Sequence, residues 1–148
     1  MPPVSKNAPQ LLLENQICFP LYSAANAVVR AYRPLLQELD LTYLQYMVMM
    51  LLWQKHSLNV KELGQRLHLD SGTLTPLLKR LEIKGLVTRN RGRTDERVRI
   101  IKITTHGLAL HQRAQDIPGK LANAVGLSKT QAKQLKALCE QLIAAIET

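Results

Sequence analysis

The sequence has few of the residues from which metal and catalytic sites are usually built. Its 148 residues include two cysteines, four histidines and eleven acidic side chains. No CxxC or HExxH motif occurs, a glycine-rich phosphate loop is missing, and the two cysteines do not make a disulfide framework. His106 and His111 are five residues apart, off the i, i+4 spacing that places two metal ligands on one helix face. We therefore expect no metal, no cofactor and no enzymatic activity, with the histidines at surface or turn positions.

Long hydrophobic runs are missing as well, and no signal peptide is expected. The most apolar run, residues 43–53, is too short to span a bilayer and contains Gln45. The first nine residues hold three prolines and no apolar segment, which predicts a loose N-terminal arm over residues 1–10. A chain with so few cysteines is expected in a reducing, cytoplasmic setting, without a membrane partner.

Apolar residues and positive charge, by contrast, are plentiful. A hydrophobic content of 46% excludes general disorder, and the length suffices for one domain, or for one domain with dimerising extensions. The net charge is +9 and the pI is near 9.9. This basic balance favours nucleic acid or another anionic surface as the partner.

Residues 60–103 have the pattern of a helix-turn-helix followed by a basic hairpin. Apolar residues recur at helical spacing in two runs, separated by a turn at residues 68–70. The apolar faces are formed by Val60, Leu63 and Leu67 in the first run and by Leu74, Leu77, Leu78 and Leu81 in the second. Gly85 follows where a helix C-terminal cap is expected. Two strands, from Leu86 and over residues 98–103, are then predicted on either side of a hairpin tip at residues 90–96.

Positive charge is concentrated in the second half of this stretch. Residues 79–102 contain nine Lys or Arg and three acidic residues, which accounts for +6 of the net +9. By itself such a cluster is typical of a solvated face. On a second helix and the hairpin behind it, however, it matches a recognition helix in the major groove with a wing on the flanking backbone or minor groove. We therefore predict a winged helix-turn-helix DNA-binding domain over residues 42–103.

The segment before this domain, residues 11–41, is predicted to be mainly helical. A regular helix is expected from about Pro20, with a kink at Pro34, because proline is tolerated in the first helical turn and is costly further in. Thr42 is the expected N-cap of the next helix, which is strongly apolar and extends to residue 56. Trp53 and the methionines of that helix are interpreted as core packing.

The segment after the domain, residues 104–148, is also predicted to be helical. Thr104 is expected to cap a helix that loosens at Pro118 and Gly119, and Ser128 with Gln131 forms a capping-box pattern before a last helix. The apolar face of that helix consists of Leu135, Leu138, Leu142, Ile143 and Ile146. Because helix-turn-helix proteins commonly bind two half-sites as dimers, both terminal segments are predicted to dimerise the chain. The alternative is that they cover the domain's own core.

Cys18 is the remaining residue with chemical potential. It is predicted to lie at the N-terminal edge of the first long helix, where unpaired amides and the helix dipole favour the nucleophilic thiolate. A lone cysteine between Ile17 and Phe19 is more commonly buried and inert. Spacing alone leaves both interpretations open.

Four segments carry a family resemblance. They are ENQICFPLY at residues 14–22, TYLQYMVMMLLW at 42–53, LDSGTLTPLLKRLE at 69–82 and the wing sequence DER at 95–97. Together they resemble the MarR family of winged-helix repressors, specifically its organic-hydroperoxide-sensing branch, the OhrR type, and the resemblance extends from about Leu12 to the last helix. It implies a mainly α-helical homodimer with a small β-hairpin wing that binds pseudo-palindromic operator DNA. Release is expected when organic hydroperoxides oxidise Cys18 to sulfenic acid.

The resemblance also implies roles for individual residues. Tyr32 and Tyr43 of the other subunit are expected to hydrogen-bond the sulfur of Cys18, which is physically reasonable because phenolic donors favour thiolate over thiol. The expected DNA contacts are Ser71, Thr73, Thr75, Lys79 and Arg80 in the recognition helix and Arg91, Arg93 and Arg97 in the wing. Asp95 is expected to be a structural partner that orients Arg97.

Two residues depart from the family's pattern. Some members resolve the sulfenic acid with a second cysteine in the helix after the wing strands, whereas Cys139 lies well into the last helix, directly after Leu138. We therefore predict a packing role for Cys139. Oxidised Cys18 is expected to form a mixed disulfide with a small cellular thiol, or to be over-oxidised. Pro20 is the second departure, at a place where it can alter how the cysteine approaches the helix end.

Three other functions are compatible with parts of the sequence. The first is a MarR-type repressor released by a small aromatic ligand, with Cys18 structural. The second is a thiol peroxidase that uses Cys18 catalytically, which the basic hairpin argues against. The third is an architectural DNA-binding protein without an effector.

Overall fold

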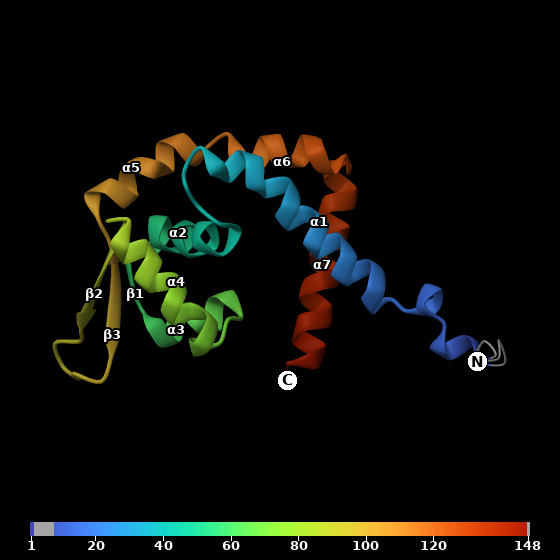
Figure 1. Ribbon diagram of the computed structural model, residues 1–148, viewed down its shortest axis with the longest axis horizontal. Coiled ribbons are helices and arrows are strands. Elements are labelled where there is room, and N and C mark those ends of the chain that lie inside the picture. Colours follow the sequence, from blue (N-terminus) through green and yellow to red (C-terminus); the bar gives the residue numbers. More distant parts are fainter. Residues whose placement is uncertain (2–7, 148) are drawn as a thin grey trace.

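The computed structural model describes Met1 and residues 8–147, and these residues form seven α-helices and one small sheet (Figure 1). The helices are α1 (Cys18–Gln37), α2 (Tyr43–Lys55), α3 (Val60–Leu67), α4 (Ser71–Ile83), α5 (Thr105–Ala114), α6 (Ile117–Val125) and α7 (Lys129–Ile146). Two short 3-10 helices, Pro9–Leu11 and Leu13–Asn15, precede α1. Residues 2–7, most of the predicted N-terminal arm, lie outside the described part of the chain.

The predicted winged helix-turn-helix is confirmed, with one additional strand. Strands β2 (Val87–Arg91) and β3 (Arg99–Ile103) form the antiparallel hairpin, and Asn90 pairs with Ile100. Strand β1 (Ser57–Asn59) was not predicted, because three residues carry no readable alternation. It pairs with β3, Leu58 opposite Ile101, and gives the sheet order β1-β3-β2. The wing is therefore anchored to the start of α3 through β1.

Short-range polar contacts define where the helices of the winged domain begin and end. At each N-terminus a side-chain oxygen accepts a hydrogen bond from the amide of the third helical residue. These cap residues are Thr42 for α2, Asn59 for α3, Asp70 for α4 and Thr104 for α5. Gly85 ends α4 with a φ of +76°, and the amide of Leu86 bonds back to the carbonyl of Leu81, as in a Schellman cap. The cap predicted at Gly85 is confirmed.

The hydrophobic core lies mainly within the winged domain, and α1, the turn after it, α5 and α6 add residues to it. Most of its fully buried side chains come from α2, α3, α4 and β3 and include Val48, Met49, Leu52, Leu63, Leu74, Leu78, Leu81 and Ile101. Trp53 packs against this core, and its ring nitrogen donates a 2.9 Å hydrogen bond to the carbonyl of Gly107 in α5. The interpretation of Met49 and Trp53 as packing residues is confirmed.

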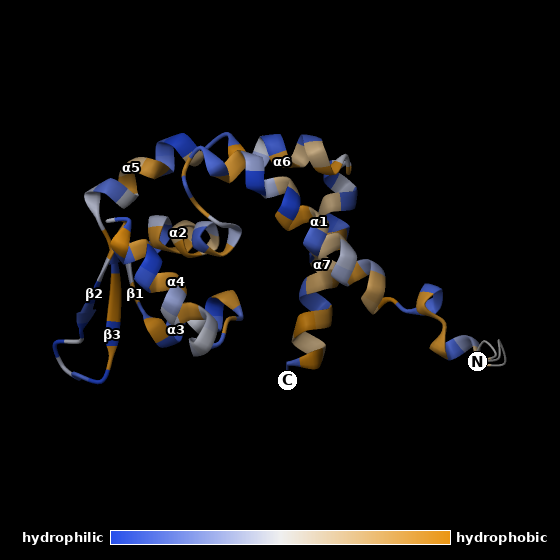
Figure 2. Cartoon of the chain, in the orientation of Figure 1, coloured by the Kyte–Doolittle hydropathy of each residue, from blue (hydrophilic) through white to orange (hydrophobic). Residues whose placement is uncertain are grey.

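Helices α1, α6 and α7 form the other end of the chain (Figure 1), where α1 packs against α6. Among the described residues of α7 none is buried, and in α1 the buried residue is Leu36. Apolar side chains on α1 and α7 lie open to solvent in the single chain. Figure 2, coloured by hydropathy, shows that hydrophobic residues alternate with hydrophilic ones along both helices. Helices α1 and α7 therefore contribute little to the core of their own chain.

Two helix boundaries differ from the prediction because proline is compatible with a first helical turn. Helix α1 begins at Cys18 rather than Pro20, which occupies the third position, where no intrahelical partner for an N–H exists. Pro118 is the second residue of α6, so it starts a new helix there and does not merely loosen α5. Helix α1 contains Pro34 and continues past it to Gln37.

Within residues 8–147, no helix combines the length and the apolar composition needed to cross a membrane.

Two glycines provide a matched test of this packing. A Cβ on Gly107 would lie 2.3 Å from the carbonyl oxygen of Leu86 and 2.8 Å from Ile103 Cγ1, so the Gly107→Ala variant must displace backbone. We expect the free energy of unfolding to fall by about 1–3 kcal/mol or more in urea titrations. At Gly119 a Cβ meets nothing within 4 Å. The Gly119→Ala variant should therefore gain about 0.5–1 kcal/mol from reduced backbone entropy of the unfolded chain. Equal stability of the two variants would contradict the close approach at Gly107.

Candidate functional site

Helix α4 presents a polar face to solvent because its leucines hold the opposite face in the core. Asp70 caps the helix, accepting a 2.7 Å hydrogen bond from the amide of Thr73, and this bond lowers the pKa of the Asp70 carboxyl. The predicted contact residues of this helix, all exposed, are Ser71, Thr73, Thr75, Lys79 and Arg80. The structure thus brings these five side chains together on one accessible helix, with hydroxyls near its start and cations in its second half.

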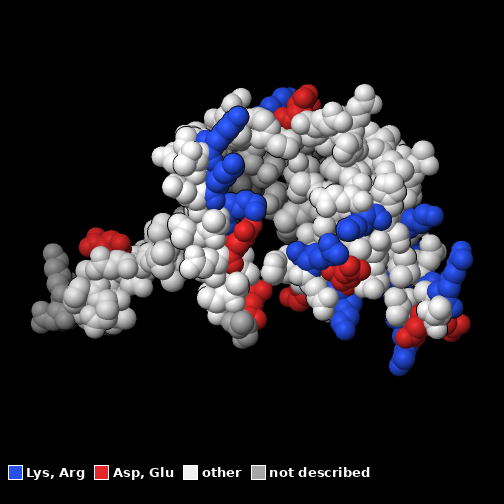
Figure 3. All heavy atoms as spheres, turned by 180° about the vertical axis from the view of Figure 1, so that it is seen from behind, with Lys and Arg blue, Asp and Glu red and all other residues white. Residues whose placement is uncertain are grey.

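The wing carries the remaining predicted cations. Arg91, at the end of β2, and Arg93 and Arg97, in the tip, are exposed. Figure 3, a view from behind, shows Lys and Arg side chains projecting from the wing with acidic side chains among them. Asp95 accepts a 3.0 Å hydrogen bond from the amide of Arg97 and pairs with its Nε at 3.2 Å. The first of these bonds lowers the pKa of Asp95.

The base of the wing is tied to α4 by an interaction that the sequence did not reveal. Glu82, on the last turn of α4, accepts hydrogen bonds of 3.2 Å from both the amide and the Nε of Arg89 on β2. A charged pair that bonds backbone and side chain together restrains both elements. The recognition helix and the base of the wing are therefore directly linked by polar contacts.

Cys18 is the first residue of α1 and is exposed, with a free thiol. Ile17 and Tyr22, at the same end of the helix, are 74% and 70% exposed, and Phe19 is 47% exposed. The thiol is therefore accessible in the single chain and lies in apolar surroundings. This position does not fit a cysteine buried in its own core.

Tyr32 and Tyr43 stack on each other, with ring centroids 4.7 Å apart, and Tyr46 lies 5.7 Å from Tyr32. Burial raises the pKa of Tyr32 to about 12, with further contributions from the two neighbouring phenols, and burial also raises the pKa of Tyr43 and of Tyr46. All three phenols are thus protonated hydrogen-bond donors at neutral pH. Tyr46 was missed in the sequence, although its i+3 spacing from Tyr43 places both on one helix face.

Cys18 and the tyrosine cluster occupy opposite ends of α1. Tyr32 follows Cys18 by fourteen residues on one helix, which at about 1.5 Å per residue is roughly 21 Å. The sulfur of Cys18 therefore cannot reach Tyr32 of its own chain.

Cys139 lies on α7, is partly buried and also carries a free thiol. The described part of the chain holds no group of three or more side chains suited to a metal ion. His56 and His68 lie at the ends of α2 and α3 with positive φ values of 63° and 54° and are exposed, which agrees with the surface or turn positions predicted for the histidines.

A cleft of about 1020 Å³ separates α1 from α4 and was not predicted. Arg33 from α1 and Arg80 and Lys84 from the end of α4 line it, together with Tyr43 and Thr73. The cleft therefore combines cations with an aromatic ring beside the recognition helix.

Comparison with known proteins places this geometry in a family. Residues 30–113, more than half of the chain, match the sequence model of the SarA/Rot transcriptional regulators. The chain is 47% identical to the organic hydroperoxide resistance transcriptional regulator of Bacillus subtilis over 136 residues, which cover 92% of this chain and 90% of that protein.

A second relative is AbfR of Staphylococcus epidermidis, which has been solved in several states. Reduced AbfR bound to DNA is 31% identical with a TM-score of 0.78, covering 95% of this chain and 98% of that one. Overoxidized AbfR bound to DNA is 30% identical with a TM-score of 0.76, covering 93% and 97%. Disulfide-formed AbfR is 31% identical with a TM-score of 0.64, covering 91% and 95%. The chain belongs to the MarR family of winged-helix DNA-binding transcriptional regulators, in the group of the organic hydroperoxide resistance regulators.

Proposed function

We propose that this protein represses transcription as a homodimer bound to operator DNA and releases the DNA when an organic hydroperoxide oxidises Cys18. The observation that carries the proposal is the position of Cys18. Its thiol is exposed at the N-terminus of α1, beside exposed apolar side chains, in a chain 47% identical to an organic hydroperoxide resistance regulator. A thiol that is to meet a small apolar peroxide needs both features.

The dimer follows from the apolar surface that the single chain leaves open. Residues 11–41 and 104–148 are proposed as the dimerisation segments, and residues 42–103 as the DNA-binding domain. Leu135, Leu138 and Ile146 of α7 are exposed by 49%, 63% and 74%. Exposed apolar faces on two long helices are stabilised by burial against a second copy. Two recognition helices would then meet two half-sites of a pseudo-palindromic operator.

The same dimer would place the tyrosine cluster of one subunit near the thiol of the other. Because Cys18 lies about 21 Å from Tyr32 along its own helix, a contact between Cys18 and Tyr32, or the Tyr43 stacked on it, must come from the partner chain. Tyr32 and Tyr43 are protonated donors at neutral pH, and donors to a sulfur anion favour the anion. We assign them the role of stabilising the thiolate.

The organic hydroperoxide is the oxidant in this step. The Cys18 thiolate attacks one peroxide oxygen, a sulfur–oxygen bond forms and the oxygen–oxygen bond breaks. Sulfur loses two electrons and, with the transferred hydroxyl group, becomes sulfenic acid. The alkoxide half of the peroxide leaves and takes up a proton, equivalent to the one released when the thiol ionised, to form an alcohol. A small thiol can then displace hydroxide, released as water, to give a mixed disulfide. Cys139 is assigned a packing role.

Oxidation removes the negative charge of the Cys18 thiolate, to which the tyrosines of the other subunit donate hydrogen bonds. Without these bonds the two subunits can reorient. A small change in the ~34 Å spacing of two recognition helices displaces both from their grooves. A difference of about 2.8 kcal/mol between the two states gives a ~100-fold change in affinity. Overoxidized AbfR is described as bound to DNA, so the sulfenic acid and the mixed disulfide are the species to which we assign release.

A second candidate function is release by a small aromatic anion, and the cleft between α1 and α4 favours it. Arg33 and Arg80 line the cleft beside Tyr43. In that case a ligand would release operator DNA without peroxide, and a chain lacking Cys18 would respond equally.

The DNA-binding residues are expected to fall into two classes. Arg93 at the wing tip is assigned to phosphate, so the Arg93→Ala variant should weaken binding on every sequence and reduce the slope of log affinity against log salt by about 1. Thr73 and Lys79 lie on α4 where base edges can be reached, so alanine there should alter sequence preference by about 1–3 kcal/mol. Fluorescence anisotropy on selected and mutated operators measures both. If the Arg93 and Thr73 variants both lost the same affinity on every DNA sequence, this division into phosphate and base contacts would be wrong.

The tyrosine cluster predicts a loss of stability at high pH. A folded-state pKa of about 12 for Tyr32, above the ordinary value of 10.0, means that folding favours the neutral phenol. That contribution is fully present below about pH 10 and is lost as pH rises from 10 through about 12. Urea midpoints should therefore fall over this interval, and tyrosinate absorbance should show a late step. The Tyr32→Phe variant should lack its part of both changes, and an unchanged titration curve would contradict the assignment.

The switch itself is tested by removing the sulfur. The Cys18→Ser variant should bind operator within about twofold of the parent and ignore cumene hydroperoxide, whereas the parent should lose about 100-fold in affinity. Tyr32→Phe and Tyr43→Phe should bind DNA but respond more slowly, and Cys139→Ser should respond normally. Anisotropy before and after peroxide, with mass spectrometry of Cys18, provides the measurement. A Cys18→Ser protein that left its operator on peroxide treatment would refute the mechanism.

A further inference from the structure

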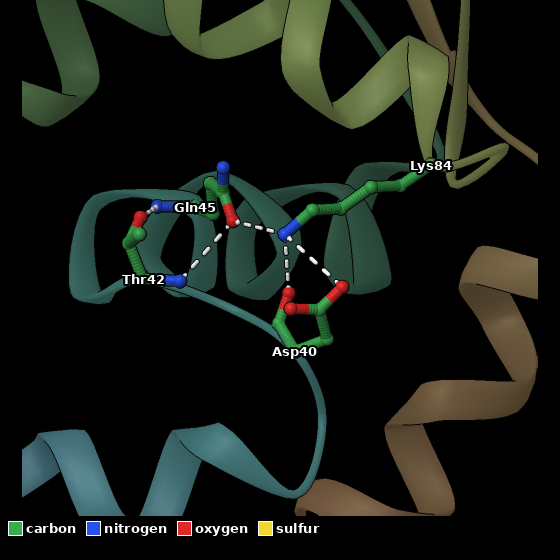
Figure 4. Close-up of polar contacts among 4 residues, drawn as sticks. All are labelled: Asp40, Thr42, Gln45 and Lys84. Carbon is green, nitrogen blue, oxygen red and sulfur yellow. Dashed lines mark hydrogen bonds and ion pairs between the residues drawn. The ribbon is translucent and has the colours of Figure 1, made fainter.

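Lys84, directly after the last helical residue of α4, is held by three oxygen atoms from outside that helix (Figure 4). Its ammonium group donates to the backbone carbonyl of Asp40 and, at 3.0 Å, to the side-chain oxygen of Gln45, and it lies 3.7 Å from the Asp40 carboxylate. An ammonium group has three protons to donate, and here the protein supplies the acceptors. Lys84 therefore joins the end of the recognition helix to the junction between α1 and α2.

Gln45 makes this junction rigid because it takes part in two interactions at once. Its side-chain oxygen accepts from the amide of Thr42 at 3.1 Å, completing the capping box of α2, and from Lys84. Gln45 is 2% exposed and is the buried polar residue in the described part of the chain. A buried amide is costly unless hydrogen-bonded, so the position of Gln45 and that of the ammonium group stabilise each other.

The backbone conformation at Asp40 determines where its carbonyl lies. Asp40 adopts a φ of +53°, a left-handed conformation that few residues other than glycine take readily. Its neighbours Leu39 and Leu41 are both buried, 6% exposed each, and anchor the loop in the core. The carbonyl that Lys84 contacts is thus attached to a fixed backbone, and the carboxylate of Asp40, 91% exposed, is the weaker partner.

We propose that Lys84 is a positioning residue that fixes the angle of the recognition helix relative to α1, and thereby the spacing between the two half-sites that the dimer accepts. The inference rests on the proposed dimeric function, because the spacing between two half-sites matters only to a protein that has two recognition helices. It does not make Lys84 a DNA contact. The side chain of Lys84 is 28% exposed and its charge is directed at the α1–α2 junction, whereas Lys79 on the same helix is open to solvent.

Operators of altered spacing test the proposal. One inserted or deleted base pair moves the half-sites by about 3.4 Å and rotates them by about 35°. We expect reduced wild-type protein to lose at least about tenfold in affinity on such operators. The Lys84→Met variant, which keeps the apolar stem and removes the ammonium group, should bind all spacings within about threefold. Its salt dependence and its preference for bases within a half-site should match the parent, since no DNA contact is removed.

Matched variants separate this role from simpler ones. Lys79→Met should flatten the salt slope or change base preference and keep the spacing preference. Asp40→Gly removes the carboxylate but keeps the carbonyl and tolerates positive φ, so it should behave as the parent. Lys84→Gln, which is shorter, should resemble Lys84→Met and provides a second variant if the first does not fold, as judged by thermal melting.

Three outcomes overturn the inference. Lys84→Met and Lys84→Gln proteins that melt normally and reject altered spacings like the parent would show that Lys84 does not position the helix. A flattened salt slope with spacing preference intact would make Lys84 a phosphate contact. A wild-type protein indifferent to spacing would refute the dimeric reading of two half-sites, and the Lys84 inference with it.

Discussion

The structure depends on one face of α4 being buried. Leu74, Leu78 and Leu81 are almost fully excluded from solvent, and that burial determines which side chains remain outside. A helix with a period of 3.6 residues cannot bury these positions without turning Thr73, Lys79 and Arg80 outward. The apolar contacts that stabilise the domain thus also orient its basic face, so stability and DNA recognition share one set of constraints.

The exposed thiol and the basic surface lie in different parts of the chain. The thiol lies at the far end of α1, whereas α4 and the wing form a basic surface held together by Glu82 and Arg89. The α1–α2 junction connects the two ends, and Lys84 joins it to α4. In the switch that we propose, this connection would transmit a local change at the sulfur as a change of angle between the two ends.

Much of the winged domain could be predicted because its signals are short-range. The Thr42 cap, the Thr104 cap and the Gly85 terminus each act within about six residues, and the spacing of leucines defines each helix face. The same local rules misplaced α1 by two residues and missed α6, since Pro20 and Pro118 are permitted in a first turn as readily as they end a helix. The sequence pattern does not distinguish these two uses of proline.

By itself the sequence determined the helix-turn-helix, the basic hairpin and the cysteine at a helix start, because periodicity, capping and charge are properties of neighbouring residues. Only the tertiary structure decided the contacts between distant ones. Strand β1 exists because Leu58 pairs with Ile101, the tyrosines form a cluster because α1 packs on α2, and Lys84 meets Gln45 across thirty-nine positions. Such contacts depend on how whole elements pack, and no local pattern encodes which surfaces will meet.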